Sequence, residues 1–162
     1  MGNSTMTDIL KLLASIIVCQ LAGFIGSLFT TPAISTWYVT LDKPPFTPPN
    51  WVFAPAWVTL YTLMAISLFL VWRKGLNSSK VKLAMSVFAI QLVLNALWSA
   101  MFFGLRSPMA GLVTINILWI AILVTIVLFL KVSRIAGFLL IPYILWVSFA
   151  TILNFSIVLL SS

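Results

Sequence analysis

Amide and aromatic side chains gather on one predicted face of residues 83–103. Gln91 and Asn95 are four positions apart, and Trp98 and Phe102 follow at spacings of three and four. Side chains at these spacings share one face of an α-helix. Amides beside flat apolar rings are the usual lining of a small-molecule site. Amides that tie membrane helices together give the same pattern, so the spacing alone leaves both interpretations open.

Two further segments carry stripes of the same kind. In one, an apolar or aromatic side chain recurs at helical spacing: Phe53, Trp57, Tyr61 and Met64. The other lies near the C-terminus and consists of Trp146, Ala150 and either Leu153 or Asn154. Three such stripes that face one another would enclose a flat apolar cavity with a few hydrogen-bond donors. Ordinary helix packing also explains each stripe by itself.

The groups needed for acid–base, hydrolytic and metal chemistry are nearly absent. The 162 residues include no histidine, one cysteine (Cys19) and two acids, Asp8 and Asp42. Zinc sites use histidine or several cysteines, and acid–base catalysis needs two groups within reach of one substrate. Asp8 and Asp42 flank opposite ends of the first apolar stretch, so they cannot act as a pair. We therefore expect a binding protein rather than an enzyme, with no cofactor and no metal.

The composition places these residues in a membrane. Hydrophobic residues make up 62% of the chain and charged residues 7%, against roughly 45–50% and 25% in soluble domains. Each of five apolar stretches is long enough to cross a ~30 Å hydrocarbon core. They cover residues 9–30, 51–72, 83–103, 109–130 and 135–160. We predict one all-α integral membrane domain over residues 1–162, a bundle of five transmembrane helices with a long proline-rich first loop.

That first loop, residues 31–50, carries five prolines and two adjacent aromatic residues. Paired prolines favour a stiff, extended backbone. We predict a lid over the bundle that includes Trp37, Tyr38, Pro44 and Pro45. A loop that only packs at the headgroup level, where tryptophan and tyrosine are common, is the alternative.

The basic residues are distributed unequally. Seven of the nine fall on the N-terminal side of the predicted bundle, and only Lys43 and Arg106 fall on the other. In a bacterial plasma membrane, which we favour, the positive-inside rule puts the N-terminus in the cytoplasm. A mitochondrial outer membrane is the alternative. Bases in short gaps between apolar stretches favour anionic headgroups as partners and argue against nucleic acid.

Three further residues carry structural expectations. Pro142 removes a backbone bond to Phe138 and is expected to kink the fifth helix. Asn116 and Gln20 are interpreted as contacts between helices.

The combined motifs resemble the translocator protein family, TspO/MBR, also called the peripheral-type benzodiazepine receptor family. The resemblance spans about residues 23–155. Its first part consists of Trp37-Tyr38, Lys43-Pro44, Pro48-Pro49, Trp51, Trp57 and Tyr61. Its second part consists of Gln91, Asn95, Trp98, Phe102-Phe103-Gly104, Pro142-Tyr143, Trp146, Phe149-Ala150 and Leu153-Asn154.

The resemblance implies a homodimer of five-helix chains with a cavity beneath the first loop. The family binds porphyrins and other tetrapyrroles, isoquinoline carboxamides and benzodiazepines, and its animal members also bind cholesterol. Carried over by position, the ligand-binding residues are Trp57, Tyr61, Gln91, Asn95, Trp98, Trp146 and Ala150.

Several positions depart from the family pattern. Phe46 stands where many members have tryptophan, and Ala110 stands where animal members have a pocket tryptophan. Phe155 replaces the tyrosine of the animal cholesterol motif, and no base follows Arg134, so we do not expect that motif to recognise cholesterol.

The expected dimer helix of some relatives carries small residues four apart. Ala96 and Ala100 have that spacing, whereas Ser86 and Ile90 break the pattern. The spacing of small residues therefore does not assign the dimer interface to one helix face.

These observations favour a membrane receptor or translocator that binds porphyrins and similar flat aromatic ligands. Trp57 and Trp146 are expected to hold the ligand, while Asn95 and Gln91 hydrogen-bond its carbonyl or carboxyl group. Without histidine, free-base porphyrin suits the site better than haem. Two alternatives remain: an enzyme that oxidatively degrades bound porphyrin through Trp57 and Trp146, and a regulatory membrane partner whose pocket is vestigial.

Overall fold

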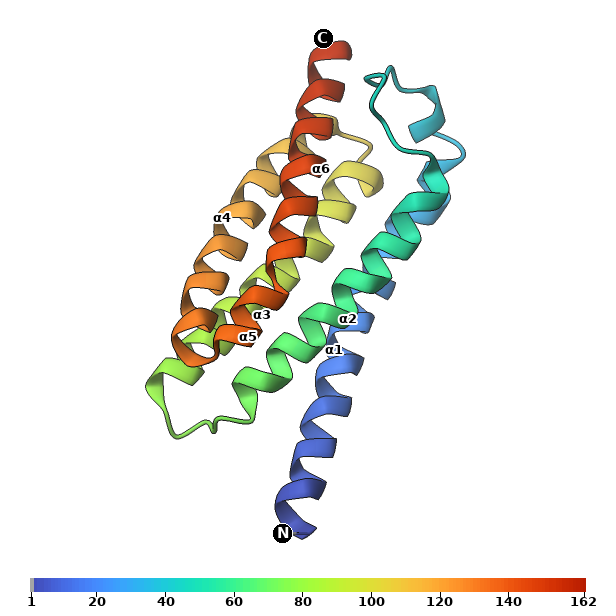
Figure 1. The fold of residues 1–162 in the computed structure, drawn as a ribbon. Coiled ribbons are helices and arrows are strands. Elements are labelled where there is room, and N and C mark those ends of the chain that lie inside the picture. The colour runs from blue at the N-terminus through green and yellow to red at the C-terminus, as the bar shows by residue number, and fades with distance from the viewer. Residues whose placement is uncertain (1) are drawn as a thin grey trace.

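The computed structural model describes residues 2–162, and every regular element in this range is a helix (Figure 1). The long helices are α1 (Gly2–Ile34), α2 (Phe53–Trp72), α3 (Ser79–Ser99), α4 (Pro108–Val132) and α6 (Ile141–Leu160). The short elements are η1 (Tyr38–Thr40), η2 (Asn50–Val52), the π-helical turn η3 (Ala100–Gly104) and α5 (Arg134–Leu139). Within this range five segments are long and apolar enough to span a membrane, which confirms the predicted fold class.

Helix α1 is longer than the apolar stretch that predicted it. It begins at Gly2 and continues to Ile34, whereas the stretch covers residues 9–30. Hydrophobicity marks only the part of a helix that lies in hydrocarbon. The mostly polar residues 3–8 continue the helix beyond that part, and Asp8 pairs with Arg73 at the end of α2, 3.4 Å away.

The fifth spanning segment is broken rather than merely bent. Leu140 separates α5 from α6, and its N–H bonds the Gly137 carbonyl oxygen at 3.2 Å. Pro142 occupies the first turn of α6, where a residue without an N–H costs little. The predicted disruption at Pro142 is therefore confirmed, and the chain restarts a helix there.

Of the two residues interpreted as contacts between helices, Gln20 makes such a contact and Asn116 does not. The Gln20 amide on α1 donates to the Thr62 hydroxyl on α2 at 3.0 Å, which confirms a contact between helices. The prediction for Asn116 is wrong within this chain. Its side chain is exposed on α4 and donates to the Leu112 carbonyl oxygen at 2.7 Å. The backbone of its own helix, and not another helix, is therefore the hydrogen-bond partner of this amide.

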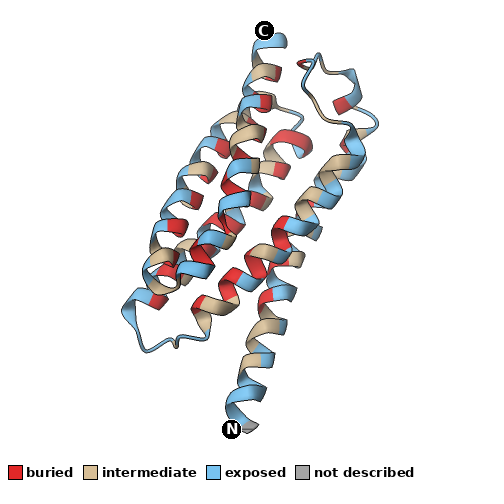
Figure 2. Ribbon diagram, viewed as in Figure 1, coloured by how far each residue is buried: buried red, intermediate tan, exposed pale blue. Residues whose placement is uncertain are grey.

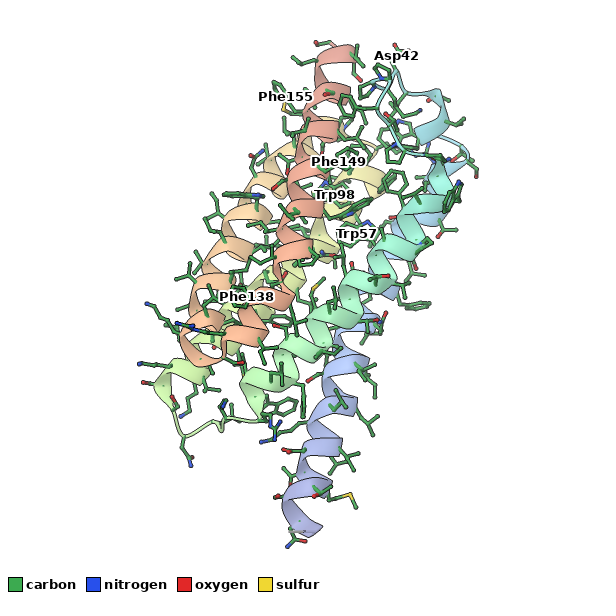
Figure 3. All side chains as sticks on the ribbon, viewed as in Figure 1. Asp42, Trp57, Trp98, Phe138, Phe149 and Phe155 are labelled. Atoms are coloured by element: carbon green, nitrogen blue, oxygen red, sulfur yellow. The ribbon has the colours of Figure 1, made fainter. Side chains whose placement is uncertain are left out.

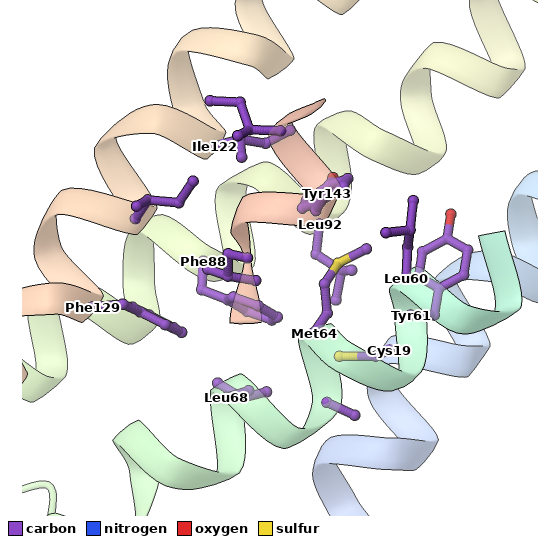
Figure 4. Close-up of a cluster of buried hydrophobic side chains, with 14 of the residues drawn as sticks. Cys19, Leu60, Tyr61, Met64, Leu68, Phe88, Leu92, Ile122, Phe129 and Tyr143 are labelled. Atoms are coloured by element: carbon purple, nitrogen blue, oxygen red, sulfur yellow. The ribbon is translucent and has the colours of Figure 1, made fainter. Parts of the chain in front are cut away.

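A large cluster of buried hydrophobic residues fills the part of the bundle nearer the loop between α2 and α3 (Figure 1). Buried residues line the inner faces of the helices, and exposed apolar residues cover the outer faces that meet lipid (Figure 2). At the core of this end Phe88 stacks on Phe129, with ring centroids 5.6 Å apart, and Met64 lies nearby (Figure 4). The closed core leaves the opposite end, where residues 31–50 and the C-terminus lie, for a ligand site.

The arrangement of the termini sharpens the prediction of orientation. The N-terminus lies at one end of the bundle, and the C-terminus lies at the other with residues 31–50 (Figure 1). We expect a reporter fused to the C-terminus to be extracytoplasmic in a bacterial plasma membrane, because the rest of the chain places seven bases on the N-terminal side. Phosphatase and fluorescent-protein fusions after Ser162 provide the measurement. An active cytoplasmic reporter at this position would contradict it.

Candidate ligand-binding cavity

A cavity of about 430 Å³ lies at the loop end of the bundle, between α1, α2, α6 and the junction of α3 with η3. Small-molecule sites generally measure about 300–1,000 Å³. Most of the wall is apolar or aromatic. Its principal side chains are Tyr38, Phe53, Trp57, Tyr61, Trp98, Phe102, Trp146 and Ala150.

Trp57 is the hub of the aromatic wall. Its ring stacks on Tyr61 with centroids 5.6 Å apart, because the two residues are one turn apart on α2. Trp98 approaches it from α3 at 6.3 Å, and Trp146 approaches from α6 at 6.5 Å with its ring almost perpendicular. Figure 3 shows Trp57 and Trp98 between α2 and α6, on the inner side of the bundle. The wall therefore offers ring faces and ring edges to one enclosed space.

The two amides of α3 lie behind this wall rather than on it. Gln91 and Asn95 are 1% and 2% exposed. The Tyr61 hydroxyl donates to Asn95 Oδ1, and Asn95 Nδ2 donates to the Tyr143 hydroxyl at 2.8 Å. The Tyr143 hydroxyl donates in turn to Gln91 Oε1 at 2.7 Å. These bonds join α2, α3 and α6, so the protein itself uses the amide groups that sequence analysis assigned to a ligand.

Tyr143 is a member of this network that the stripes did not reveal. It is fully buried, with an exposed fraction of 1%. A signal was available, because Tyr143, Val147 and Ala150 follow the helical spacing of the α6 stripe.

Asn154 fixes Trp98 on the wall. Its Oδ1 accepts from Trp98 Nε1 at 3.2 Å, and its Nδ2 donates to the Pro108 carbonyl oxygen at 2.8 Å. These bonds join α6 to α3 and to the start of α4. Trp146 differs from Trp98, because its Nε1 is buried without a hydrogen-bond partner among residues 2–162.

Helix α1 supplies the fourth wall, which sequence analysis missed. A Cβ atom at Gly23 would lie 2.6 Å from the ring of Tyr61, so glycine permits this close approach. A Cβ atom at Gly26 would lie 3.1 Å from Ser99 Oγ. Two glycines three positions apart in an apolar helix were the available signal for close packing.

The first loop borders the outer end of the cavity through Tyr38. Tyr38 packs against Phe53 and Phe103, with ring centroids at 6.4 and 5.8 Å, and its side chain reaches the cavity wall. The ammonium group of Lys43 donates to the carbonyl oxygens of Tyr38 and Leu41 at 2.7 and 3.0 Å. The ring of Phe46 packs against that of Phe149 on α6, with ring centroids 6.3 Å apart. The loop is thus held onto the bundle through the side chains of Tyr38 and Phe46.

The other predicted lid residues take supporting places. Trp37 packs edge-on against Phe102 at 5.5 Å and does not reach the cavity wall. Pro44 is buried and accepts a turn-forming bond from the Thr47 N–H at 3.1 Å, whereas Pro45 is exposed. Of the four, Tyr38 is the one that borders the cavity.

Comparison with known proteins decides the family. The TspO/MBR family model matches residues 15–160. The chain belongs to the TspO/MBR family. It is 50% identical to the tryptophan-rich protein TspO of Archaeoglobus fulgidus, over 96% of this chain and 99% of that protein. It is 47% identical to the tryptophan-rich protein TspO of Chlorobaculum tepidum, over 95% of this chain and 98% of that protein. It is 37% identical to the translocator protein of Homo sapiens, over 85% and 82% of the two chains.

TspO/MBR membership and the five apolar spans together establish a multi-pass membrane protein. The site residues implied by the family resemblance divide into two groups in the structure. Those on the cavity wall are Trp57, Tyr61, Trp98, Trp146 and Ala150. Gln91 and Asn95 lie one layer deeper and hold Tyr61 and Tyr143 in place.

The departures from the TspO/MBR pattern fall outside the cavity. Ala110 lies in the first turn of α4, where its N–H bonds the Ser107 hydroxyl at 3.1 Å. Phe155 is exposed on the outer side of α6 (Figure 3). Neither residue belongs to the wall described above.

Proposed function

We propose that the protein is a membrane receptor or translocator that binds a flat aromatic ligand, with porphyrins and other tetrapyrroles as the preferred class. The observation that carries this proposal is the aromatic cavity inside the membrane bundle. Its volume of about 430 Å³ and its wall of tryptophan, tyrosine and phenylalanine suit a flat apolar molecule. The relatives named translocator protein support transfer as the role of that binding, and the relative named tryptophan-rich sensory protein supports sensing.

The proposed binding mode follows from the ring orientations. Trp57 and Tyr61 are nearly parallel, with 28° between their planes, and present a broad surface for stacking. The ring plane of Trp146 is nearly perpendicular to that of Trp57, with 88° between the two planes. Aromatic rings favour offset-stacked and edge-to-face contacts, so the two indoles complement the face and the edge of one macrocycle. We also propose that the chain forms a homodimer with a second copy of itself and that its outer surface contacts bilayer lipid.

A titration of free-base protoporphyrin tests the proposal. We expect saturable binding by the purified protein, read from the shift of the porphyrin absorbance band and from quenching of tryptophan fluorescence. Three tryptophans border the cavity, so quenching and absorbance should saturate together. Porphyrin that partitions into empty micelles serves as the control. A signal that rises linearly with porphyrin and matches the micelle control would contradict the proposed function.

Degradation of bound porphyrin is a second candidate, favoured by the clustering of oxidisable indoles. The ring centroids of Trp98 and Trp146 lie 6.3 and 6.5 Å from that of Trp57. Porphyrin absorbance is followed over time in light and in darkness for the wild type, Trp57→Phe and Trp146→Phe. Binding alone predicts equal, slow bleaching in all three proteins. Faster bleaching by the wild type than by both variants, at equal occupancy, would establish turnover and replace the binding-only role.

A further inference from the structure

The hydroxyl group of Ser99 is the exception among the buried polar side chains of residues 2–162. These side chains belong to Ser15, Ser67, Gln91, Asn95, Thr114, Thr125, Asn154 and Ser99. The first seven all hydrogen-bond to other residues. The Ser99 hydroxyl has no partner in this range. Buried polar groups in folded proteins are nearly always hydrogen-bonded, so the exception requires an explanation.

The Ser99 hydroxyl oxygen keeps surface that a ligand in the cavity can reach. Ser99 is 8% exposed and belongs to the cavity wall. The fully covered side-chain atoms without a partner, among residues 2–162, are the Tyr38 hydroxyl and Trp146 Nε1, so the Ser99 oxygen is not one of them. Gly26 of α1 also borders the cavity and has no side chain to cover this oxygen, because a Cβ atom there would lie 3.1 Å from it.

Other helical hydroxyls near the cavity are already engaged by their own backbone. Thr30 of α1 donates to the Gly26 carbonyl oxygen at 3.1 Å, and Thr151 of α6 donates to the Val147 carbonyl oxygen at 2.7 Å. Serine and threonine commonly bond backward in this way inside helices. Ser99 ends α3 directly before the π-helical turn η3, a rare kind of turn that often lies at functional sites. Its proton is therefore free for another molecule.

The surroundings of Ser99 favour a neutral hydrogen-bond acceptor. Asn95, one turn earlier on α3, already bonds Tyr61 and Tyr143, so the hydrogen-bonding role expected of the amide is left to the next turn. No charged side chain among residues 2–162 lines the cavity. An ionised group buried there without a counter-charge would cost far more than a neutral oxygen. The hydroxyl therefore suits a carbonyl oxygen better than an ionised carboxylate.

We propose that Ser99 recognises a neutral carbonyl group at the edge of the bound ligand, by donating its hydroxyl proton into a hydrogen bond on the α3 wall of the cavity. This inference rests on the proposed function and makes it more specific. The preferred ligand is a flat aromatic molecule that carries an ester, an amide or a protonated carboxylic acid. The rings of Trp57 and Tyr61 hold its apolar face, and Ser99 distinguishes ligands that share the same ring system.

Two probes and two variants test the assignment. The probes are protoporphyrin IX dimethyl ester, which carries two ester carbonyls, and octaethylporphyrin, whose edge carries only ethyl groups; both are uncharged free bases. The test variant is Ser99→Ala, which removes the hydroxyl and leaves the helix intact. The matched control is Ser86→Ala, which removes an exposed hydroxyl earlier on α3, where it donates to the Lys82 carbonyl oxygen at 2.8 Å.

We expect Ser99→Ala to weaken binding of the dimethyl ester about three- to tenfold, as loss of one neutral hydrogen bond does, and to leave octaethylporphyrin binding unchanged. Ser86→Ala should bind both probes like the wild type. The melting temperature of ligand-free Ser99→Ala should equal or exceed that of the wild type, because the removed hydroxyl has no partner among residues 2–162.

Two results would overturn the inference while leaving the proposed function intact. One is an equal change, or no change, in the affinity of Ser99→Ala for both probes. The other is a lower melting temperature of the ligand-free variant, which would give the hydroxyl a structural role. Absence of saturable binding of either porphyrin by the wild type would instead overturn the proposed function, and this inference with it.

Discussion

Asn95→Leu is expected to destabilise the purified protein by about 1–3 kcal/mol. The change removes the partner of the buried Tyr61 hydroxyl and one of the two bonds of the Tyr143 hydroxyl, which still donates to Gln91. A buried polar group without a partner costs about 1–3 kcal/mol, although single hydrogen bonds between membrane helices average roughly 0.6 kcal/mol. Because Asn95 bonds both α2 and α6, the loss should approach the sum of two such bonds and loosen the wall behind Tyr61.

Reversible unfolding in detergent measures this effect, and Asn116→Leu is the matched control. Asn116 is exposed on α4 and bonds only its own helix backbone in the chain described here. We expect that control to change stability by less than about 0.5 kcal/mol. If Asn95→Leu were as stable as Asn116→Leu, the structural role of Asn95 would be contradicted and the amide would be assigned to ligand binding.

Among variants that remove a ring from the cavity wall, Trp57→Ala is expected to have the largest effect on ligand affinity, a loss of about ten- to a hundredfold. Trp57 contacts Tyr61, Trp98 and Trp146 in one cluster, and its removal takes away the main stacking surface of the wall. A loss of this size corresponds to about 1.4–2.8 kcal/mol, in the range of one well-placed aromatic contact with its buried area. Trp57→Phe should recover much of the affinity, because it restores a ring.

The affinity is read from porphyrin absorbance, so that removing a tryptophan does not alter the signal itself. Trp51→Ala is the control, since Trp51 lies at the start of the same spanning segment but is 74% exposed and outside the cavity wall. It should bind porphyrin like the wild type. Equal losses in Trp51→Ala and Trp57→Ala would point to a surface or micelle effect.

Much of the architecture could be predicted from the chain, because membrane insertion depends on features that the sequence displays directly. Apolar length predicts five spans, and Pro142 marks the interruption of the fifth. The ends of α1 could not be predicted in the same way, since its polar first turns lie outside the apolar stretch. Helical spacing also placed Trp57 and Trp146 on inward faces, where the structure brings their rings together.

The layer to which each side chain belongs could not be predicted from spacing. Gln91 and Asn95 share a face with Trp98, yet the amides lie deeper in the bundle, and only Trp98 borders the cavity. Spacing gives the direction of a side chain around its own helix, whereas depth depends on how closely the neighbouring helix approaches. Here Gly23 lets α1 come close to Tyr61, which then covers Asn95.

The location of the ligand is the central claim, and a steric block inside the cavity tests it most directly. Ala150 is buried on the wall contributed by α6, whereas Leu145 is exposed on the outer side of the same helix. Protoporphyrin is titrated against the wild type, Ala150→Phe and Leu145→Phe, after each protein has been shown to fold. We predict that Ala150→Phe loses saturable binding while Leu145→Phe keeps the wild-type affinity. Wild-type binding by a folded Ala150→Phe protein would contradict the claim that the ligand occupies this cavity.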